Sequence, residues 1–128
     1  MDRTRWADLA SIVPGDTASM EEDVSANRVA EFVRFSGDDN PLHVDESAAR
    51  ACGFPRPIAH GMLAMTLLSR LIGTRLPGPG SLWISQDSAF LGPVFPGERI
   101  SARATVTQVS LAARTVVLST SSCPTRRG

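Results

Sequence analysis

The most apolar stretch of the chain is Gly61-Met62-Leu63-Ala64-Met65-Thr66-Leu67-Leu68-Ser69-Arg70-Leu71-Ile72. Its apolar residues fall on nearly every face of a helix, so other parts of the molecule must cover most of that helix. Thr66 and Ser69 are its only hydroxyl residues, and each can either bond to a carbonyl one turn earlier or line a ligand tunnel. The sequence therefore predicts a central, enclosed helix.

Strand-like segments lie on both sides of this helix in the sequence. Residues 17–24 form a weak candidate strand, and residues 81–85, 87–91, 99–108 and 114–120 form four more after a turn at 77–80. Residues 101–109 alternate between polar and apolar, which is typical of a half-buried antiparallel strand. We expect an α+β fold in which a curved antiparallel sheet wraps one helix, with Trp83 and Phe90 in the core of the sheet.

Two shorter helices are expected between the first strand and the central helix. Ser25 can cap a helix that ends at Gly37, and Asp45 can cap a second helix through Ala51. Residues 38–43 between them are expected to form a loop, because Pro41 holds the preceding residue in an extended conformation.

Composition limits the possible functions. The 128 residues fit a single domain over 1–128, and 13 basic residues balance 13 acidic ones, so no nucleic-acid partner is expected. The central apolar stretch is too short to cross a bilayer, which argues against a membrane protein. Cys52 and Cys123 have no metal-ligand spacing, and no signal sequence is evident, so we expect a cytoplasmic protein without a metal.

The two histidines of the chain lie in two turn-rich motifs, and His43 belongs to the first. Asp38 and His43 are separated by a loop that Pro41 stiffens, and such a loop can bring both side chains to one point. A carboxylate and a neutral imidazole around one water molecule suit proton transfer near neutral pH. The alternative is structural: Asp38 caps a turn, Asn40 forms an Asx-turn and His43 packs on the surface. Asp39 competes with Asp38 for the catalytic role, and composition does not separate them.

The second motif places His60 and Gly61 at the start of the apolar helix. The first backbone N–H groups of a helix lack partners within it, and the helix dipole adds positive potential there. Glycine also lets a ligand carbonyl approach closely, so this terminus can stabilise an oxyanion or enolate. Gly61 can instead be a steric requirement of the turn, and for His60 we favour a structural role.

Together the two motifs resemble the hydratase-2 motif of MaoC-like hot-dog proteins, and most closely that of short (R)-specific enoyl-CoA hydratases of polyhydroxyalkanoate synthesis. The residues that carry the resemblance are Phe35-Ser36-Gly37-Asp38-Asp39-Asn40-Pro41-Leu42-His43-Val44-Asp45 and Arg56-Pro57-Ile58-Ala59-His60-Gly61-Met62-Leu63. The similarity continues through residues 76–81 and 92–98, and covers about residues 17–110.

The resemblance implies a hot-dog fold, a homodimer and a hydro-lyase that needs no metal or redox cofactor. Asp38 and His43 match the family's catalytic pair, which activates water for addition to a trans-2-enoyl thioester. Gly61 matches the glycine whose N–H receives the thioester oxygen, and Ser69 falls where the family has a serine near the site. Asn40 and His60 would support the loop. The substrate would be an acyl-CoA or an acyl-carrier-protein thioester.

The chain departs from the family pattern after about residue 120. A polar tail stands where the family continues into a further strand, so we expect an unpaired sheet edge or an altered dimer. Two other functions stay open. One is a 3-hydroxyacyl dehydratase acting on the acyl carrier protein, and the other is a hot-dog subunit that binds acyl thioesters without catalysis.

Overall fold

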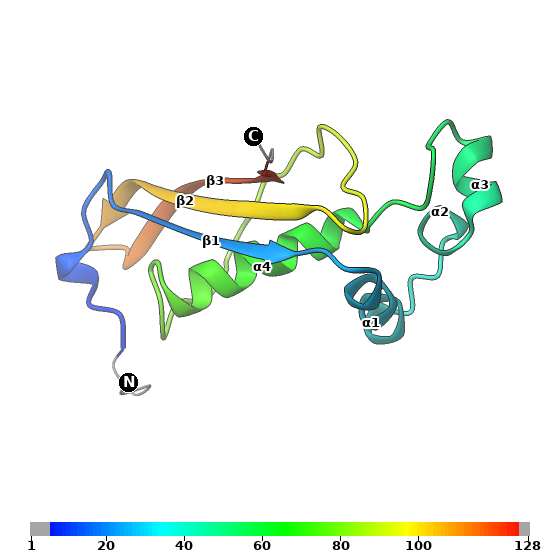
Figure 1. Ribbon diagram of the computed structural model, residues 1–128. Coiled ribbons are helices and arrows are strands. Elements are labelled where there is room, and N and C mark those ends of the chain that lie inside the picture. The colour runs from blue at the N-terminus through cyan, green and yellow to red at the C-terminus, as the bar shows by residue number, and fades with distance from the viewer. Residues whose placement is uncertain (1–5, 126–128) are drawn as a thin grey trace.

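The computed structural model describes residues 6–125, which form one antiparallel sheet and a group of helices (Figure 1). The order of elements is a short 3-10 turn η1 (Leu9–Ser11), β1 (Thr17–Asp23), α1 (Ala26–Ser36), α2 (Pro41–Val44), α3 (Glu46–Ala51), α4 (Gly61–Thr74), β2 (Arg99–Ser110) and β3 (Thr115–Pro124). Helices α1, α2 and α3 gather at one end of the sheet, and α4 runs along it.

The sheet has the order β1-β2-β3, and both pairings are antiparallel. Ala18 lies opposite Ala104, and Ala104 lies opposite Thr120 on the other side. Helix α4 packs against this sheet, and Leu71 is completely buried at the contact. The small side chains of Ala102 and Ala104 let the helix approach the sheet closely, and the core also contains Val24, Val29, Ala59, Leu67, Leu68 and Ile100.

The expected helix boundaries upstream of α4 are confirmed. The Ser25 hydroxyl accepts a hydrogen bond from the Arg28 N–H at 3.1 Å, and Gly37 ends α1 in the left-handed conformation with φ 75°. A carboxylate oxygen of Asp45 caps α3 by accepting from the Ala48 N–H at 3.1 Å. The expected loop over residues 38–43 is partly wrong, because Pro41 begins the one-turn helix α2. Proline suits the first position of a helix, where no partner for an N–H is required.

Two expected strands are absent from the described residues. Residues 81–85 and 87–91 form neither helix nor strand, and Trp83 and Phe90 are 40% and 59% exposed rather than in a core. A strand exists only through bonds to a neighbouring strand. Residues 82–93 make no backbone hydrogen bond to any described residue. Despite their apolar composition, they therefore do not form a strand.

Strand β3 and helix α4 also differ from expectation. The strand expected at 114–120 continues to Pro124, so residues 121–124, the first half of the supposed polar tail, belong to the sheet. Helix α4 is less enclosed than its composition predicts, because Met62, Thr66, Ser69 and Gly73 lie on an exposed face. The sheet covers one side of the helix, and the segment between α4 and β2 covers the other side only in part.

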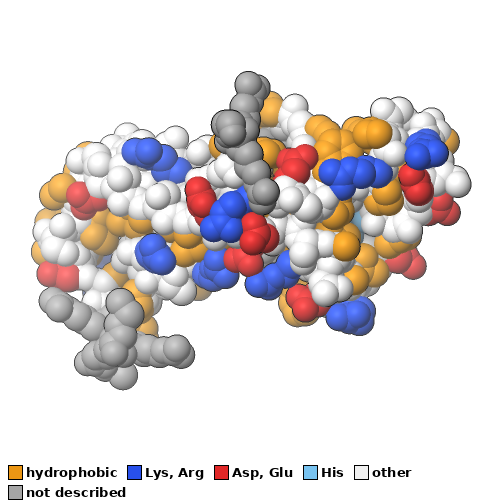
Figure 2. Space-filling view, in the orientation of Figure 1, with side chains coloured by type: hydrophobic (Ala, Val, Ile, Leu, Met, Phe, Trp, Pro, Cys, Tyr) orange, Lys and Arg blue, Asp and Glu red, His pale blue; other side chains and the backbone are white. Residues whose placement is uncertain are grey.

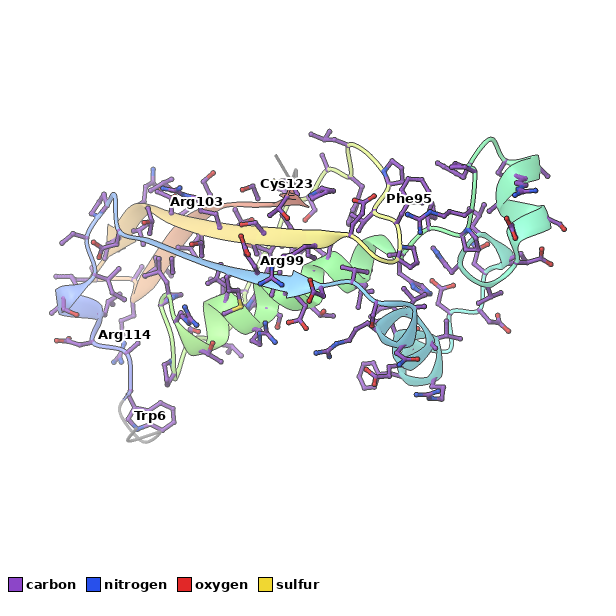
Figure 3. All side chains as sticks on the ribbon, in the orientation of Figure 1. Trp6, Phe95, Arg99, Arg103, Arg114 and Cys123 are labelled. Carbon is purple, nitrogen blue, oxygen red and sulfur yellow. The ribbon has the colours of Figure 1, made fainter. Side chains whose placement is uncertain are left out.

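Charged side chains of both signs gather over the middle of the face in Figure 2. Arg99 on β2 pairs with Glu21 at 2.7 Å and with Asp23 at 2.9 Å on the neighbouring strand β1 (Figure 3). The hydrogen bonds that Arg99 donates to Glu21 and then to Asp23 raise the pKa of Arg99 above its ordinary value. Over residues 6–125, every helix falls short of the length and apolar character that a membrane crossing requires.

Candidate active site

The two histidines meet at the end of the sheet where α1, α2 and the beginning of α4 come together. One carboxylate oxygen of Asp38 and one ring nitrogen of each of His43 and His60 lie within 4.8 Å of one another. His43 is half-buried, His60 is 3% exposed, and Asp38 is exposed. The fold therefore places a carboxylate and two imidazoles between the solvent and the core.

The hydrogen bonding of His43 fixes which of its nitrogens can act. Its Nδ1 lies 2.7 Å from the carbonyl oxygen of Ile58, which can only accept, so Nδ1 carries the proton. The Nε2 atom of the neutral ring then has a free lone pair. This is the arrangement of a general base, whose ring is held by a backbone carbonyl on one side and presents an acceptor on the other.

His60 connects three parts of the site. Its Nε2–H donates to the backbone carbonyl of Asp38 at 2.9 Å, across 22 positions of sequence. Its ring stacks on His43 with centroids 3.7 Å apart, and it contacts Phe32 of α1 with centroids 4.7 Å apart. The Nδ1 atom is buried and has no partner among the described residues. These contacts are those of a residue that supports the loop.

The structure separates the two neighbouring aspartates. Asp38 is the one whose carboxylate lies near the two histidines, and Asp39 is not in that group. One carboxylate oxygen of Asp38 accepts from the Asn40 N–H at 3.2 Å. The Asn40 side chain in turn caps α2 by accepting from the Leu42 N–H at 3.1 Å, so it braces the turn between Asp38 and His43. Composition left this choice open and the resemblance selected Asp38, and the direction of the loop brings the Asp38 carboxylate to the histidines.

Gly61 begins α4 directly after His60, and no side chain caps this helix terminus. The N–H groups of Gly61 and Met62 have no acceptor among the described residues, whereas the Leu63 N–H bonds to the His60 carbonyl at 3.0 Å. The helix dipole favours negative charge at this terminus. A Cβ atom at Gly61 would lie 2.9 Å from two ring atoms of Phe90, so a larger residue there requires that ring to move. Ser69 lies on α4 about 12 Å further along the helix axis, and its expected contact with substrate stays a prediction.

The geometry of the three ligand-type residues does not favour a metal ion. Two imidazoles that bind one ion must direct lone pairs in their ring planes at the same point. The rings of His43 and His60 are stacked, with centroids 3.7 Å apart and only 27° between their planes, so lone pairs in the two nearly parallel planes do not readily converge on one ion. One nitrogen of each ring is also engaged by a backbone carbonyl. The arrangement suits proton transfer better than metal binding.

Three residues of the site were not identified as such in the sequence. Phe32 packs on His60, the carbonyl of Ile58 orients His43, and Phe90 lies over Gly61. Phe32 was visible only as an apolar position of α1, and Phe90 was assigned to the sheet. A backbone carbonyl such as that of Ile58 has no sequence signal, because every residue carries one.

Comparisons with known proteins show the family to which the chain belongs. Residues 12–123 match the family described as the MaoC like domain. The (R)-specific enoyl-CoA hydratase of Aeromonas caviae is 42% identical over 97 residues, which are 76% of this chain and 72% of that protein. A mitochondrial 3-hydroxyacyl-[acyl-carrier-protein] dehydratase of Arabidopsis thaliana is 34% identical over 86 residues, which are 67% of this chain and 51% of that protein.

Among solved structures, the (R)-hydratase from A. caviae involved in PHA biosynthesis superposes with a TM-score of 0.84 at 38% sequence identity. The match covers 89% of this chain and 86% of that one. The expected hot-dog fold, an α+β arrangement of antiparallel sheet and long helix, is confirmed by this similarity.

Proposed function

Because the chain belongs to the MaoC-like domain family, we propose that it catalyses the reversible, (R)-specific hydration of a trans-2-enoyl-CoA to an (R)-3-hydroxyacyl-CoA. The observation that carries this proposal is the hydrogen bond from His60 to the Asp38 carbonyl at 2.9 Å. That bond ties the Asp38–His43 loop to the N-terminus of α4, so the proton-handling pair and the free N–H groups of the helix belong to one site.

In the proposed mechanism, Asp38 and the free Nε2 of His43 hold one water molecule and remove its proton. The hydroxyl oxygen bonds to C3, and the electrons of the C2–C3 double bond move toward the thioester carbonyl. The proton taken from water is then delivered to C2. A positioned acid–base group typically contributes about 10²- to 10⁴-fold in rate.

The N–H of Gly61 is proposed to donate a hydrogen bond to the thioester oxygen as enolate character develops. The donor costs no reorganisation during the reaction, because α4 holds it in place, and loss of one such donor typically costs about 3–4 kcal/mol of transition-state stabilisation. Asn40 and His60 hold the loop, and Ser69 is proposed to contact the substrate further along α4. The chemistry needs no metal or redox cofactor.

The second candidate is dehydration of a 3-hydroxyacyl thioester on the acyl carrier protein. The similarity to the Arabidopsis dehydratase favours it. The reaction is the reverse of hydration and needs the same groups, so only the carrier distinguishes the two. Rates with matched CoA and acyl-carrier-protein thioesters decide between them, and the carrier with the higher kcat/KM is the natural one.

The physiological setting is proposed on the same grounds. We place the protein in a reducing cytoplasm, where the free thiols of Cys52 and Cys123 are stable. A homodimer is proposed because large apolar side chains such as Leu82, Ile84 and Leu91 are exposed. Supply of (R)-3-hydroxyacyl-CoA to polyhydroxyalkanoate synthesis is the proposed use, by similarity to the Aeromonas protein.

Hydration of crotonyl-CoA by the purified protein tests the proposal. We expect loss of the ultraviolet absorbance of the enoyl thioester, and chiral analysis is expected to give the (R)-3-hydroxybutyryl product. An (S) product would contradict the assigned stereochemistry. Absence of turnover with both carriers would overturn catalysis and leave the acyl-thioester-binding subunit as the function.

A further inference from the structure

One carboxylate near the end of β1 binds two helices at once. An oxygen of Glu22 accepts a hydrogen bond from the Arg28 guanidinium of α1 at 2.7 Å. The other oxygen accepts from the Arg70 guanidinium of α4 at 2.6 Å. These contacts, which we call the Glu22 ion pairs, join the helix before the Asp38–His43 loop to the helix that begins at Gly61.

The Glu22 ion pairs lie where the packing between α1 and α4 is incomplete. A cleft of about 250 Å³ opens among the two helices and the end of β1, and all three residues of the ion pairs line it. Of the 11 residues of α1, Val29 alone is buried. Apolar packing therefore holds α1 by a small surface, and the ion pairs add a directed contact to α4.

The charge of Glu22 also separates two like charges. Arg28 and Arg70 approach the same carboxylate, so their guanidinium groups lie close to each other on either side of it. Without a negative charge between them the two cations would repel each other, and the repulsion would push α1 away from α4. Other acidic side chains do not replace it, because Glu31 is 3.9 Å from Arg28 and Asp23 binds a different arginine.

The Glu22 ion pairs are connected to the site through one face of α1. Arg28 and Phe32 are four residues apart on this helix, so their side chains lie on the same face, one turn apart. Phe32 contacts the ring of His60 with centroids 4.7 Å apart, and His60 bonds to the carbonyl of Asp38. The position of α1 relative to α4 therefore affects where the Asp38 loop lies relative to the N-terminus of α4.

We propose that Glu22 is a positioning residue for the hydration reaction. It touches no reacting atom, but by holding α1 to α4 it fixes the distance between the water-activating pair and the N–H of Gly61. The transition state needs both groups at once, whereas substrate binding depends less on their spacing, so loss of Glu22 lowers kcat rather than raising KM. The kinetic part of this inference rests on the proposed function, while the placement of α1 against His60 is measured without turnover.

Glu22→Gln tests the kinetic part, and Glu21→Gln is its matched control. Glu21 precedes Glu22 on the same strand and binds Arg99 within the sheet, so its loss leaves α1 and α4 unaffected. We expect Glu22→Gln to lower kcat for crotonyl-CoA about five- to tenfold with KM within about twofold of the wild type, a smaller loss than the ~10²-fold of a 1 Å misplacement. Glu21→Gln should leave both parameters unchanged. Equal kcat in the two variants, or a loss confined to KM, would overturn the proposal.

Removal of a second charge supplies a rescue experiment. In the double variant Glu22→Gln/Arg70→Gln, the repulsion between the guanidinium groups of Arg28 and Arg70 is absent. We therefore expect kcat to recover at least about twofold relative to Glu22→Gln, because two residues in contact do not act additively. A double variant with lower kcat than Glu22→Gln would show that the two side chains act separately, and it would overturn the proposal.

Nuclear magnetic resonance of the two histidines measures the placement of α1 directly. The chain has only two histidines, so variants that lack one of them assign the imidazole signals. We expect Glu22→Gln, but not Glu21→Gln, to shift the ring signals of His60, because the ring of Phe32 moves relative to it. Unshifted signals would overturn the positioning role.

The same spectra separate failure of this inference from failure of the proposed function. If the wild-type protein turns over neither carrier's thioester, the hydratase proposal fails, and the His60 signals alone decide whether Glu22 positions α1. Arg70→Gln breaks the contact from the side of α4, and it is expected to shift the His60 signals as well. It decides the matter if Glu22→Gln does not fold, and unshifted signals in a folded Arg70→Gln would then overturn the proposal.

Discussion

Two connecting segments flank α4, and they are held in very different ways. Residues 37–60, before the helix, are fixed by specific bonds: Asn40 caps α2, His43 bonds to Ile58, and His60 bonds to Asp38. Residues 82–93, after the helix, which we call the bridging segment, make no backbone hydrogen bond to a described residue. Their side chains Gln86 and Ser88 approach the sulfur of Met65 only at 3.8 and 4.0 Å. Side chains that bond to the backbone thus connect the first segment to the fold, whereas the exposed apolar side chains of the second make no such bonds.

The largest effect expected in the first segment is that of His43→Gln. Loss of the free Nε2 removes the proposed base, so kcat/KM for crotonyl-CoA should fall by about 10²- to 10⁴-fold. The melting temperature is measured in parallel, because the ring also stacks on His60. His43→Phe, which keeps an aromatic ring there, should lose the same activity; activity retained in either variant would show that His43 is not the base.

Substitutions in the buried face of α4 should lower the free energy of unfolding far more than substitutions in the bridging segment. Leu71 is completely buried against the sheet, so Leu71→Ala is expected to lower the free energy of unfolding by about 2–5 kcal/mol. Leu82 is 84% exposed, so Leu82→Ala should change it by less than about 0.5 kcal/mol in the monomer. Urea denaturation at low protein concentration measures both. Similar losses would mean that the bridging segment packs in a core.

The meeting point of the two segments is tested with Gly61→Ala. Its methyl group would lie 2.9 Å from the ring of Phe90, while the backbone N–H remains. We expect kcat/KM to fall by about tenfold, because the loosely held ring can move aside. This loss is smaller than the ~10²-fold loss that a 1 Å misplacement of a reacting group can cause. The double variant Gly61→Ala/Phe90→Ala should recover most of the loss. A double variant as impaired as Gly61→Ala would mean that the ring is not the obstacle.

The smallest effect is expected for Asn40→Ala. Loss of the side-chain cap of α2 should cost about 1 kcal/mol of stability. Activity should fall with it, because the cap sets the path from Asp38 to His43. Ser88→Ala in the bridging segment is the control, since its contact with Met65 is 4.0 Å long. Thermal unfolding and crotonyl-CoA turnover measure the two effects, and equal losses in both variants would remove the contrast between the segments.

The sequence predicted correctly those parts of the fold that depend on neighbouring residues in the chain. Ser25, Gly37 and Asp45 predicted helix ends because a cap needs only its own neighbours in the chain. The same reasoning failed at residues 81–91, whose composition is that of a strand. A strand needs a partner distant in sequence, and no described residue provides one.

For the site, too, the sequence indicated residues within local motifs but not contacts between distant segments. The motifs indicated Asp38, His43 and Gly61. Composition did not separate Asp38 from Asp39, and only the resemblance selected Asp38, because the two aspartates differ in the direction of their side chains from one loop. The motifs did not predict that Phe90 would cover Gly61. Gly61 begins α4 and Phe90 follows the end of that helix, so the two residues are distant in the sequence. Ser69 was selected by resemblance, and its position on the exposed face of α4 leaves its role to experiment.

The most direct test of the account compares Asp38→Asn with Asp39→Asn in the hydration of crotonyl-CoA. The two residues are adjacent, exposed and chemically identical, and only Asp38 directs its carboxylate to the histidines. We predict that Asp38→Asn lowers kcat/KM by about 10²- to 10⁴-fold, whereas Asp39→Asn stays within about twofold of the wild type. Equal activity of the two variants, or a larger loss in Asp39→Asn, would contradict the proposed catalytic pair.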